Sequence, residues 1–299
     1  FENLGFAPTV INGGILNSCN TNAYLGKGDW LVAEADESDG SFNKLPAHIA
    51  VVTNIDPEHM EFYGNFTTLR AAFKAFIEKV PFYGFAVLCS DHMELKNLST
   101  EIKDRKIITY GEGEEALVRA VNIKPKVNGL AFDLEVKLAN YAGTYKNFFV
   151  PMFGKYNVAN SLAAIAVALG LGAKIDNIQK SLAGFLGVKR RLTITGIVKN
   201  NITIIDDYGH HPTEIKASLG AVKEMNDIKA KRGKVIAVMQ PHRYSRLYDL
   251  FNEFSHCLIE ADKIFVTDVY AAGEQEISGI NKMALIKAIQ NNGHKNVYA

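Results

Sequence analysis

The segment "ITIIDDYGHHPTEI", residues 202–215, places two aspartates, a tyrosine and two adjacent histidines between two different hydrophobic patterns. Its first four residues are β-branched, which predicts a strand. From Ile215 onward, apolar residues recur at helical spacing. Pro212 and Glu214 suit the first helical turn, because proline loses no hydrogen bond there and a carboxylate stabilises the helix dipole. The segment therefore predicts a strand end that leads into a helix.

The same succession of apolar run, polar cluster and helical segment recurs along the chain. The other runs are "WLVAEADESDG" (30–40), "HIAVVTNIDPEH" (48–59), "FAVLCSDH" (85–92), "KVIAVMQPHRYSR" (234–246) and "KIFVTDVYAAGE" (263–274). Alternation with helices, such as the one expected over 67–80, predicts an α/β fold with βα units and a parallel sheet. Ligands of such sheets bind beyond the carboxyl ends of the strands, where these polar clusters lie.

The middle of the chain has a different pattern. Residues 118–150 alternate between apolar and polar, which predicts a small antiparallel meander with a turn near "NYAGTY". An Ala-rich helix follows, opened by Asn157 or Asn160 and ended near Gly170, and a second helix is expected over about 175–184. We place the domain boundary near residue 188, giving domains 1–188 and 189–299.

Composition excludes several classes of protein. The chain has 299 residues, 47% of them hydrophobic and 22% charged, which is enough for two cored domains. A net charge of +1 gives no electrostatic basis for binding nucleic acid or an anionic membrane. No apolar run reaches the length of a membrane span. Three cysteines, with Cys89 and Cys257 in core-like patterns, indicate a reducing compartment rather than a disulfide framework.

Four carboxylates lie within six residues of the first strand end: Glu34, Asp36, Glu37 and Asp39. Like charges this close repel one another, so Mg²⁺, a basic side chain or a helix N-terminus would stabilise them. The alternative is a solvated acidic turn in which Asp36 and Asp39 cap the next segment.

A second polar cluster follows the strand that ends near residue 52. Thr53, Asn54, Asp56 and His59 lie there, in the same expected sheet as Glu34. A single histidine is often a structural residue, but its place at a strand end makes a ligand role for His59 an equal alternative.

Basic residues gather at two places. Residues 189–191, "KRR", lie at the expected domain junction and are either a solvated linker or a phosphate contact. His242, Arg243 and Arg246 follow a strand, and the two arginines would project together from a helical turn. Such a pair suits a carboxylate or phosphate ligand.

The two histidines of the opening segment have different expected roles. Adjacent residues on an extended segment point to opposite sides, so His210 and His211 are not expected to bind one ion together. We expect His210 to face the cleft with Tyr208 and His211 to serve the helix start. A zinc site that includes Asp206 and Asp207 is disfavoured because the spacing fits no standard ligand set.

These clusters together resemble the Mur ligases of bacterial peptidoglycan synthesis. The motifs, in the family's order, are "EADESDGSF", "VVTNIDPEHM", "PFYGFAVLC", "FGKYNVANSLAA", "DDYGHHPTEI", "QPHRYSR" and "DVYAAGE". The resemblance covers nearly the whole chain. Three positions depart from it: the family usually has His where Tyr156 stands, Phe where Leu192 stands and Asp where Glu58 stands.

The resemblance implies a partial central ATPase domain followed by most of a Rossmann-like C-terminal domain. The UDP-binding domain, the P-loop and the extreme C-terminus would lie outside this sequence. It also implies a cytoplasmic, ATP- and Mg²⁺-dependent ligase that joins L-alanine to the lactyl carboxylate of UDP-N-acetylmuramate through an acyl phosphate. A murein peptide as acceptor and a non-catalytic binding fragment are the alternatives, and monomer or dimer is left open.

The resemblance further implies roles for single residues on the nucleotide side. Glu34 would hold Mg²⁺, His59 would lie at a second metal ion and the substrate, and both would take part in catalysis. Arg191 would be a catalytic contact to the phosphates. Asn157 and Asn160 would contact the nucleotide.

On the substrate side, the resemblance implies six binding residues. These are Thr53, Asn54, Tyr208, His210, Arg243 and Arg246. The last four would form the pocket for L-alanine and the muramoyl end.

Overall fold

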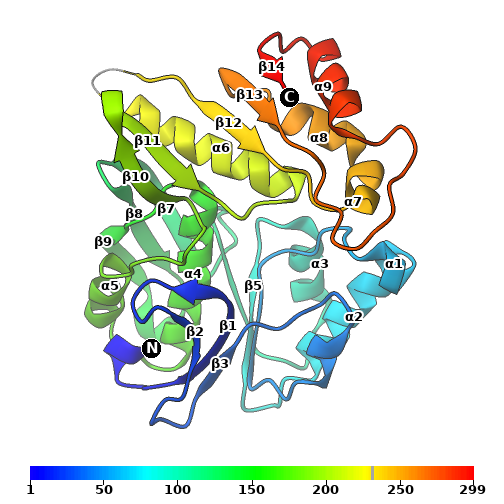
Figure 1. Cartoon of the computed structure of the whole chain (residues 1–299). Coiled ribbons are helices and arrows are strands. Elements are labelled where there is room, and N and C mark those ends of the chain that lie inside the picture. Colours follow the sequence, from blue (N-terminus) through cyan, green and yellow to red (C-terminus); the bar gives the residue numbers. More distant parts are fainter. Residues whose placement is uncertain (230–231) are drawn as a thin grey trace. The chain divides into compact units, whose positions relative to one another are not determined.

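The structure, a computed structural model, describes residues 1–229 and 232–299. The chain divides into two compact units, Phe1–Lys189 and Arg190–Ala299 (Figure 1). Each unit has its own hydrophobic core. Among the described residues, no helix combines the length and apolar character that crossing a membrane requires.

A six-stranded sheet forms the centre of the first unit. Its strands, in spatial order, are β4 (Ile49–Val52), β5 (Phe85–Cys89), β6 (Ile107–Gly111), β7 (Val118–Lys126), β8 (Gly129–Val136) and β9 (Gly143–Val150). The first four run parallel and the last three form an antiparallel meander. Both predictions, the parallel sheet and the meander, are confirmed. All five residues of β5 are buried, as expected for a strand covered on both faces.

Five α-helices accompany this sheet in the described part of the unit. They are α1 (Met60–Tyr63), α2 (Phe66–Glu78), α3 (Met93–Glu101), α4 (Lys155–Gly170) and α5 (Ile175–Ala183), with short 3₁₀ turns η1 (Glu2–Leu4), η2 (Ser41–Lys44) and η3 (Ala139–Tyr141). The prediction that Asn157 or Asn160 opens the Ala-rich helix is wrong. Gly154 is the N-cap at φ 89°, a conformation open to glycine, so α4 starts earlier and both asparagines lie inside it.

The strand before the acidic cluster belongs to a different sheet from the one expected. A separate three-stranded sheet has the order β2 (Thr21–Tyr24), β1 (Thr9–Leu16), β3 (Leu31–Ala33). Glu34 follows β3, which pairs in parallel with β1, whereas His59 follows β4 of the six-stranded sheet. The expectation of one shared sheet is therefore wrong, because an apolar pattern identifies a strand but not its neighbour.

The second unit contains a parallel sheet and a separate hairpin. The sheet is β12 (Ile236–Met239), β13 (Lys263–Val266) and β14 (Val297–Tyr298), and the hairpin is β10 (Thr193–Val198), η4 (Lys199–Asn201) and β11 (Ile202–Asp206). The helices are α6 (Pro212–Asp227), α7 (Tyr244–Asp249), α8 (Phe251–Cys257) and α9 (Lys282–Asn291).

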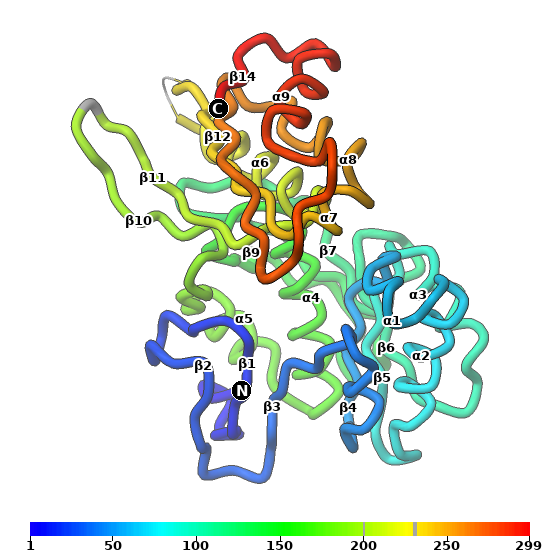
Figure 2. Tube along the Cα trace, turned by 45° about the vertical axis from the view of Figure 1, so that its right-hand side comes forward, coloured from blue at the N-terminus to red at the C-terminus, as the bar shows by residue number. Residues whose placement is uncertain are grey.

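The strand of the opening segment is confirmed, but its membership of the parallel sheet is not. β11 pairs antiparallel with β10 alone, and Figure 2 shows the pair as a two-stranded arm. Asn201, at φ 61°, allows the chain to turn back at once, so the nearest strand in sequence becomes the partner. The helix that follows begins at Pro212, as predicted.

Candidate functional site

A histidine surrounded by carboxylates is the centre of the candidate site in the first unit. His59 Nε2 lies 3.4 Å from Glu37 Oε1 and 3.8 Å from Glu58 Oε2, and its Nδ1 lies 3.7 Å from Glu61 Oε1. Within the described ranges, Glu37, Glu58 and His59 bring one ligand atom each to within 4.8 Å of one another. Carboxylate oxygens with an imidazole nitrogen make a donor set that can hold a divalent cation.

The backbone around this cluster is held in an uncommon conformation. His59 is left-handed, at φ 58° and ψ 35°, and is the N-cap of α1. Tyr63 on α1 is buried, and its hydroxyl donates to the Glu37 carbonyl at 2.5 Å. The acidic loop is therefore attached to α1 by the Glu37 main chain and by its side chain. Strain of this kind, about 1–3 kcal/mol per residue, is common at functional sites.

The four carboxylates of the acidic cluster have separate surroundings. Asp36 accepts from Ser38 N–H at 2.8 Å, within the loop, and Asp39 accepts from Ser41 N–H at 2.9 Å, at the first residue of η2. Of the two aspartates that we expected to cap the next segment, only Asp39 bonds its start, and the N-cap residue itself is Gly40. Hydrogen bonds from Ser41 lower the pKa of Asp39.

Glu34 does not belong to the group around His59. Its Oε2 accepts from the Gly13 N–H of β1 at 2.6 Å. Its role as a Mg²⁺ ligand stays a prediction. Glu37, which our sequence reasoning placed in the acidic cluster but did not select, is the member that contacts His59.

Polar residues after neighbouring parallel strands meet at one edge of the six-stranded sheet. Asp56 follows β4 and His92 follows β5, with Oδ1 and Nε2 3.7 Å apart. Asp91 accepts from Glu112 N–H at 2.7 Å and from Gly113 N–H at 3.0 Å, and both of these residues follow β6. The expected convergence at strand ends is confirmed for these three strands.

The other predicted residues of the first unit have no partner that supports a ligand role by itself. Thr53 and Asn54 are exposed just beyond β4. Asn157 is buried and its Nδ2 donates to Phe153 O at 2.7 Å, which ties it to the start of α4. Asn160 is exposed, about one turn further along the helix. Their contacts to nucleotide and substrate stay predictions.

The start of α6 organises the candidate site of the second unit. His211 is the N-cap, and its Nδ1 accepts from Thr213 N–H at 3.3 Å. Glu214 Oε2 accepts from His210 N–H at 3.0 Å and from His211 N–H at 3.2 Å, completing a capping box. The prediction that His211 serves the helix start is confirmed.

Glu214 remains ionised in this position. Burial opposes ionisation, but the N–H groups of His210 and His211, with the charges of His210 and Arg191, outweigh it and lower the pKa of Glu214. Arg191 Nη1 lies 3.4 Å from Glu214 Oε1, so the same carboxylate contacts the predicted phosphate-binding arginine.

Asp207 connects three segments, and our sequence reasoning gave it no such role. It accepts from Leu192 N–H at 2.9 Å, from Gly209 N–H at 2.8 Å and from Ser218 Oγ at 3.0 Å. It therefore holds the Arg191 segment, the site loop and α6 together. An aspartate two residues before a glycine was the available signal, because such side chains bond backbone N–H groups in turns.

Four aromatic rings form a row beside this loop. Ring centroids lie 5.3 Å apart for Tyr208 and His210, 6.0 Å for His210 and His242, and 5.2 Å for His242 and Tyr270. The Arg190 guanidinium lies over the Tyr208 ring at 4.7 Å. Tyr208 and His210 are neighbours as predicted, whereas Tyr270 was missed, although it follows a strand of the parallel sheet.

The predicted arginine pair lies at the start of α7. Arg246 Nη1 is 3.5 Å from His242 Nδ1, and Arg243, left-handed at φ 71°, is the N-cap. Arg243 Nη1 is 4.0 Å from Glu274 Oε1. A hydrogen bond from Ser245 N–H chiefly lowers the pKa of Glu274, so the carboxylate is charged beside Arg243.

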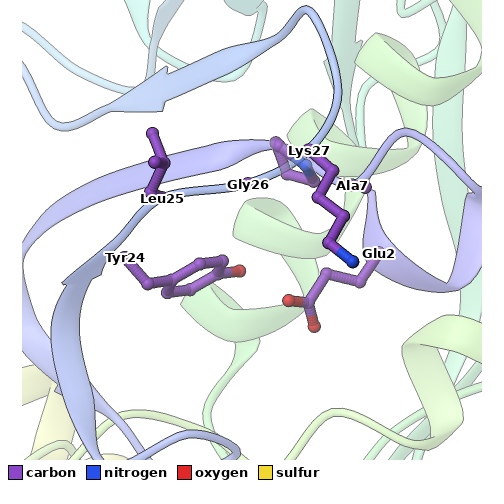
Figure 3. A pocket seen from close by; sticks show the side chains of 7 residues that line it. Glu2, Ala7, Tyr24, Leu25, Gly26 and Lys27 are labelled. Carbon is purple, nitrogen blue, oxygen red and sulfur yellow. The ribbon is translucent and has the colours of Figure 1, made fainter.

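Two cavities lie away from the predicted residues. One of about 320 Å³ is lined by Glu2, Tyr24 and Lys27 among others, and Figure 3 shows the Tyr24 hydroxyl directed toward Glu2. Burial, then a hydrogen bond with Glu2, raises the pKa of Tyr24 to about 12. The other, about 500 Å³, lies between Tyr244 and the loop before α9. Neither is lined by a residue that we selected for a site role, although Tyr244, Asp268 and Val269 of the second cavity lie in the motifs "QPHRYSR" and "DVYAAGE".

Comparisons with known proteins identify related chains. Residues 16–168 match the Mur ligase middle domain, and residues 190–299 match the Mur ligase, glutamate ligase domain. The UDP-N-acetylmuramate–L-alanine ligase of Rhodospirillum centenum is 53% identical over 300 residues, covering 100% of this chain and 61% of the relative. That of Agrobacterium fabrum is 53% identical, covering 96% and 60%. The chain thus spans about three fifths of the length of these relatives.

Solved structures give the same assignment of fold. The UDP-N-acetylmuramate–alanine ligase MurC of Thermotoga maritima superposes with a TM-score of 0.78 at 27% identity, covering 100% of this chain and 61% of that one. MurF of Acinetobacter baumannii superposes with a TM-score of 0.72 at 22% identity, covering 99% and 64%, which shows a shared fold.

Proposed function

Because the chain belongs to the Mur ligase family, we propose that it is part of an ATP-dependent ligase that joins L-alanine to the lactyl carboxylate of UDP-N-acetylmuramate. The observation that carries this proposal is the 53% identity, over the whole chain, to a UDP-N-acetylmuramate–L-alanine ligase. The reaction belongs to peptidoglycan synthesis. We place it in the cytoplasm, since the proposed substrates include nucleotides and all three cysteines are free.

The first unit would act on the phosphates. Glu37, Glu58 and His59 would hold one Mg²⁺ and Glu34, which lies outside that group, would hold another, and carboxylates are donors that fit this hard cation. When bound, the ion would neutralise charge on the phosphoryl oxygens as the substrate carboxylate becomes an acyl phosphate. Asn157 and Asn160 would contact the nucleotide, and Thr53 and Asn54 the substrate beyond β4.

The second unit would supply the acceptor side. Arg243 and Arg246 would bind the carboxylate of L-alanine, for which the planar guanidinium fork is well suited. Tyr208 and His210 would form the wall of that pocket, and Arg191 would reach the phosphates. The ion pair of Arg191 with Glu214 supports this role, because it places the guanidinium beside the site loop.

The test is a ligation assay on the full-length natural protein with ATP, Mg²⁺, UDP-N-acetylmuramate and labelled L-alanine. We expect labelled UDP-N-acetylmuramoyl-alanine and stoichiometric ADP. Glu34→Gln should lower turnover by about 10² or more if it removes a charged ligand of a hard cation. Asp39→Asn is the matched control, since Asp39 caps Ser41, and it should change turnover little. Preferential use of a murein peptide instead of L-alanine would contradict the proposed acceptor.

A further inference from the structure

His242 lies at the centre of the contacts around Arg246. Arg246 Nη1 is 3.5 Å from His242 Nδ1, a long hydrogen bond. A guanidinium can only donate, so Nδ1 must be the acceptor and the imidazole must be neutral, with its proton on Nε2. Both side chains are half-buried, which restricts the other partners available to them.

The imidazole also packs against Tyr270. The two rings stack with centroids 5.2 Å apart and planes 24° apart. The backbones are also joined, since Arg243 N–H donates to Tyr270 O and Tyr270 N–H donates to Pro241 O, both at 2.8 Å. The loops after β12 and β13 are thus attached to each other at His242, which holds its backbone in place while the stacked Tyr270 ring restricts the plane of the imidazole.

We propose that His242 is a positioning residue, whose imidazole, stacked on Tyr270, orients the Arg246 guanidinium toward the carboxylate of the amino-acid substrate, L-alanine. That the bound carboxylate belongs to L-alanine rests on the proposed function. The orientation of Arg246 by His242 rests on the contacts alone.

The charges around His242 keep its imidazole neutral. Burial lowers the pKa of His242 first, and Arg246, His210 and Arg243 lower it further, while Glu274 raises it in part. Tyr270, the stacking partner, is a further titratable group beside it. When the pH falls through the lowered pKa, the imidazolium can no longer accept from Arg246 and repels it. The orientation of Arg246 is therefore present at neutral pH and lost in acid.

Two variants of the full-length natural protein separate positioning from packing. In His242→Asn, Oδ1 takes the place of Nδ1 and can accept from Arg246, whereas in His242→Gln the polar atoms lie one bond further out. We expect the KM for L-alanine to be about tenfold higher in His242→Gln than in His242→Asn, as for loss of a hydrogen bond to a charged group. The KM for ATP should differ by less than about twofold between them, because no phosphate contact changes.

The pH profile provides the second readout. In the wild type, the KM for L-alanine should rise as the pH falls through the pKa of His242, and this rise should be absent in His242→Asn. Three results would overturn the positioning role. The KM for L-alanine could be equal in the two variants, or the KM for ATP could change in parallel with it. The KM for L-alanine could also still rise in acid in His242→Asn.

A measurement without substrate tests the orientation by itself. In protein labelled with ¹⁵N-arginine, the side-chain N–H hydrogens of Arg246 should exchange slowly with solvent at neutral pH, both in the wild type and in His242→Asn. They should lose this protection in His242→Gln, and in the wild type in acid. If this pattern appears but L-alanine is not ligated, the proposed function fails and the positioning contact stands. If L-alanine is ligated and Arg246 is indifferent to residue 242, the inference fails alone.

Discussion

Removal of the Glu214 carboxylate should destabilise the second unit and disorder the site loop. Glu214 accepts from the N–H groups of His210 and His211 and pairs with Arg191. Loss of a capping interaction costs about 1 kcal/mol and a further backbone hydrogen bond about 1 kcal/mol. The half-exposed Arg191 pair adds at most about 0.5 kcal/mol. We expect Glu214→Ala to lower the free energy of unfolding by about 2 kcal/mol, which is about 10 °C in Tm for a unit of this size.

Scanning calorimetry of this chain measures the effect, with the transition of the second unit followed separately because two domains need not unfold together. Glu214→Gln, which keeps an acceptor oxygen for the N–H groups, should lose about half as much. Glu253→Ala is the matched control, because Glu253 is an exposed acidic residue in the first turn of α8. It should cost only a few tenths of a kcal/mol from the helix dipole.

The acid dependence gives the decisive comparison. The folded-state pKa of Glu214 is lowered, so its stabilisation is present above the pKa of the unfolded chain, about 4.3, and is lost as the pH falls through the folded value. The difference between wild type and Glu214→Ala should therefore shrink in acid. A cost equal to that of Glu253→Ala, or a difference independent of pH, would refute the capping-box reasoning.

Three further predictions concern single residues. Glu37→Gln should weaken Mn²⁺ binding by about tenfold, since it removes one charged donor beside His59. Electron paramagnetic resonance measures the Mn²⁺ affinity, and an unchanged affinity would show that Glu37 is not part of the metal site. Arg246→Lys in the full-length natural protein should raise the KM for L-alanine but not for ATP, because an ammonium cannot replace the bidentate fork, and equal rises would indicate a structural role. Cys19 is exposed, whereas burial raises the pKa of Cys257 to about 12. A thiol reagent at pH 8 should therefore label Cys19 and leave Cys257 unmodified. Equal labelling of the two cysteines would contradict the burial of Cys257.

The sequence was sufficient for features encoded by neighbouring residues. Strand β11, the start of α6 at Pro212 and the capping role of His211 follow from β-branching, helical spacing and cap chemistry within one short segment. The alternation over 118–150 gave the meander for the same reason, because a period of two places every second side chain in the core. The motifs also identified the family, since their order along the chain is itself a sequence property.

The choice of partners between distant segments was decided by the tertiary structure. The apolar pattern of β3 did not show that its neighbour is β1, and the pattern of β11 did not show that it pairs with β10. The reason is that every apolar strand presents similar hydrogen-bonding edges. Likewise, four nearby carboxylates did not reveal that Glu37 meets His59 while Glu34 accepts from Gly13. These contacts depend on how the strands and loops are placed in three dimensions, and local periodicity carries no record of that placement.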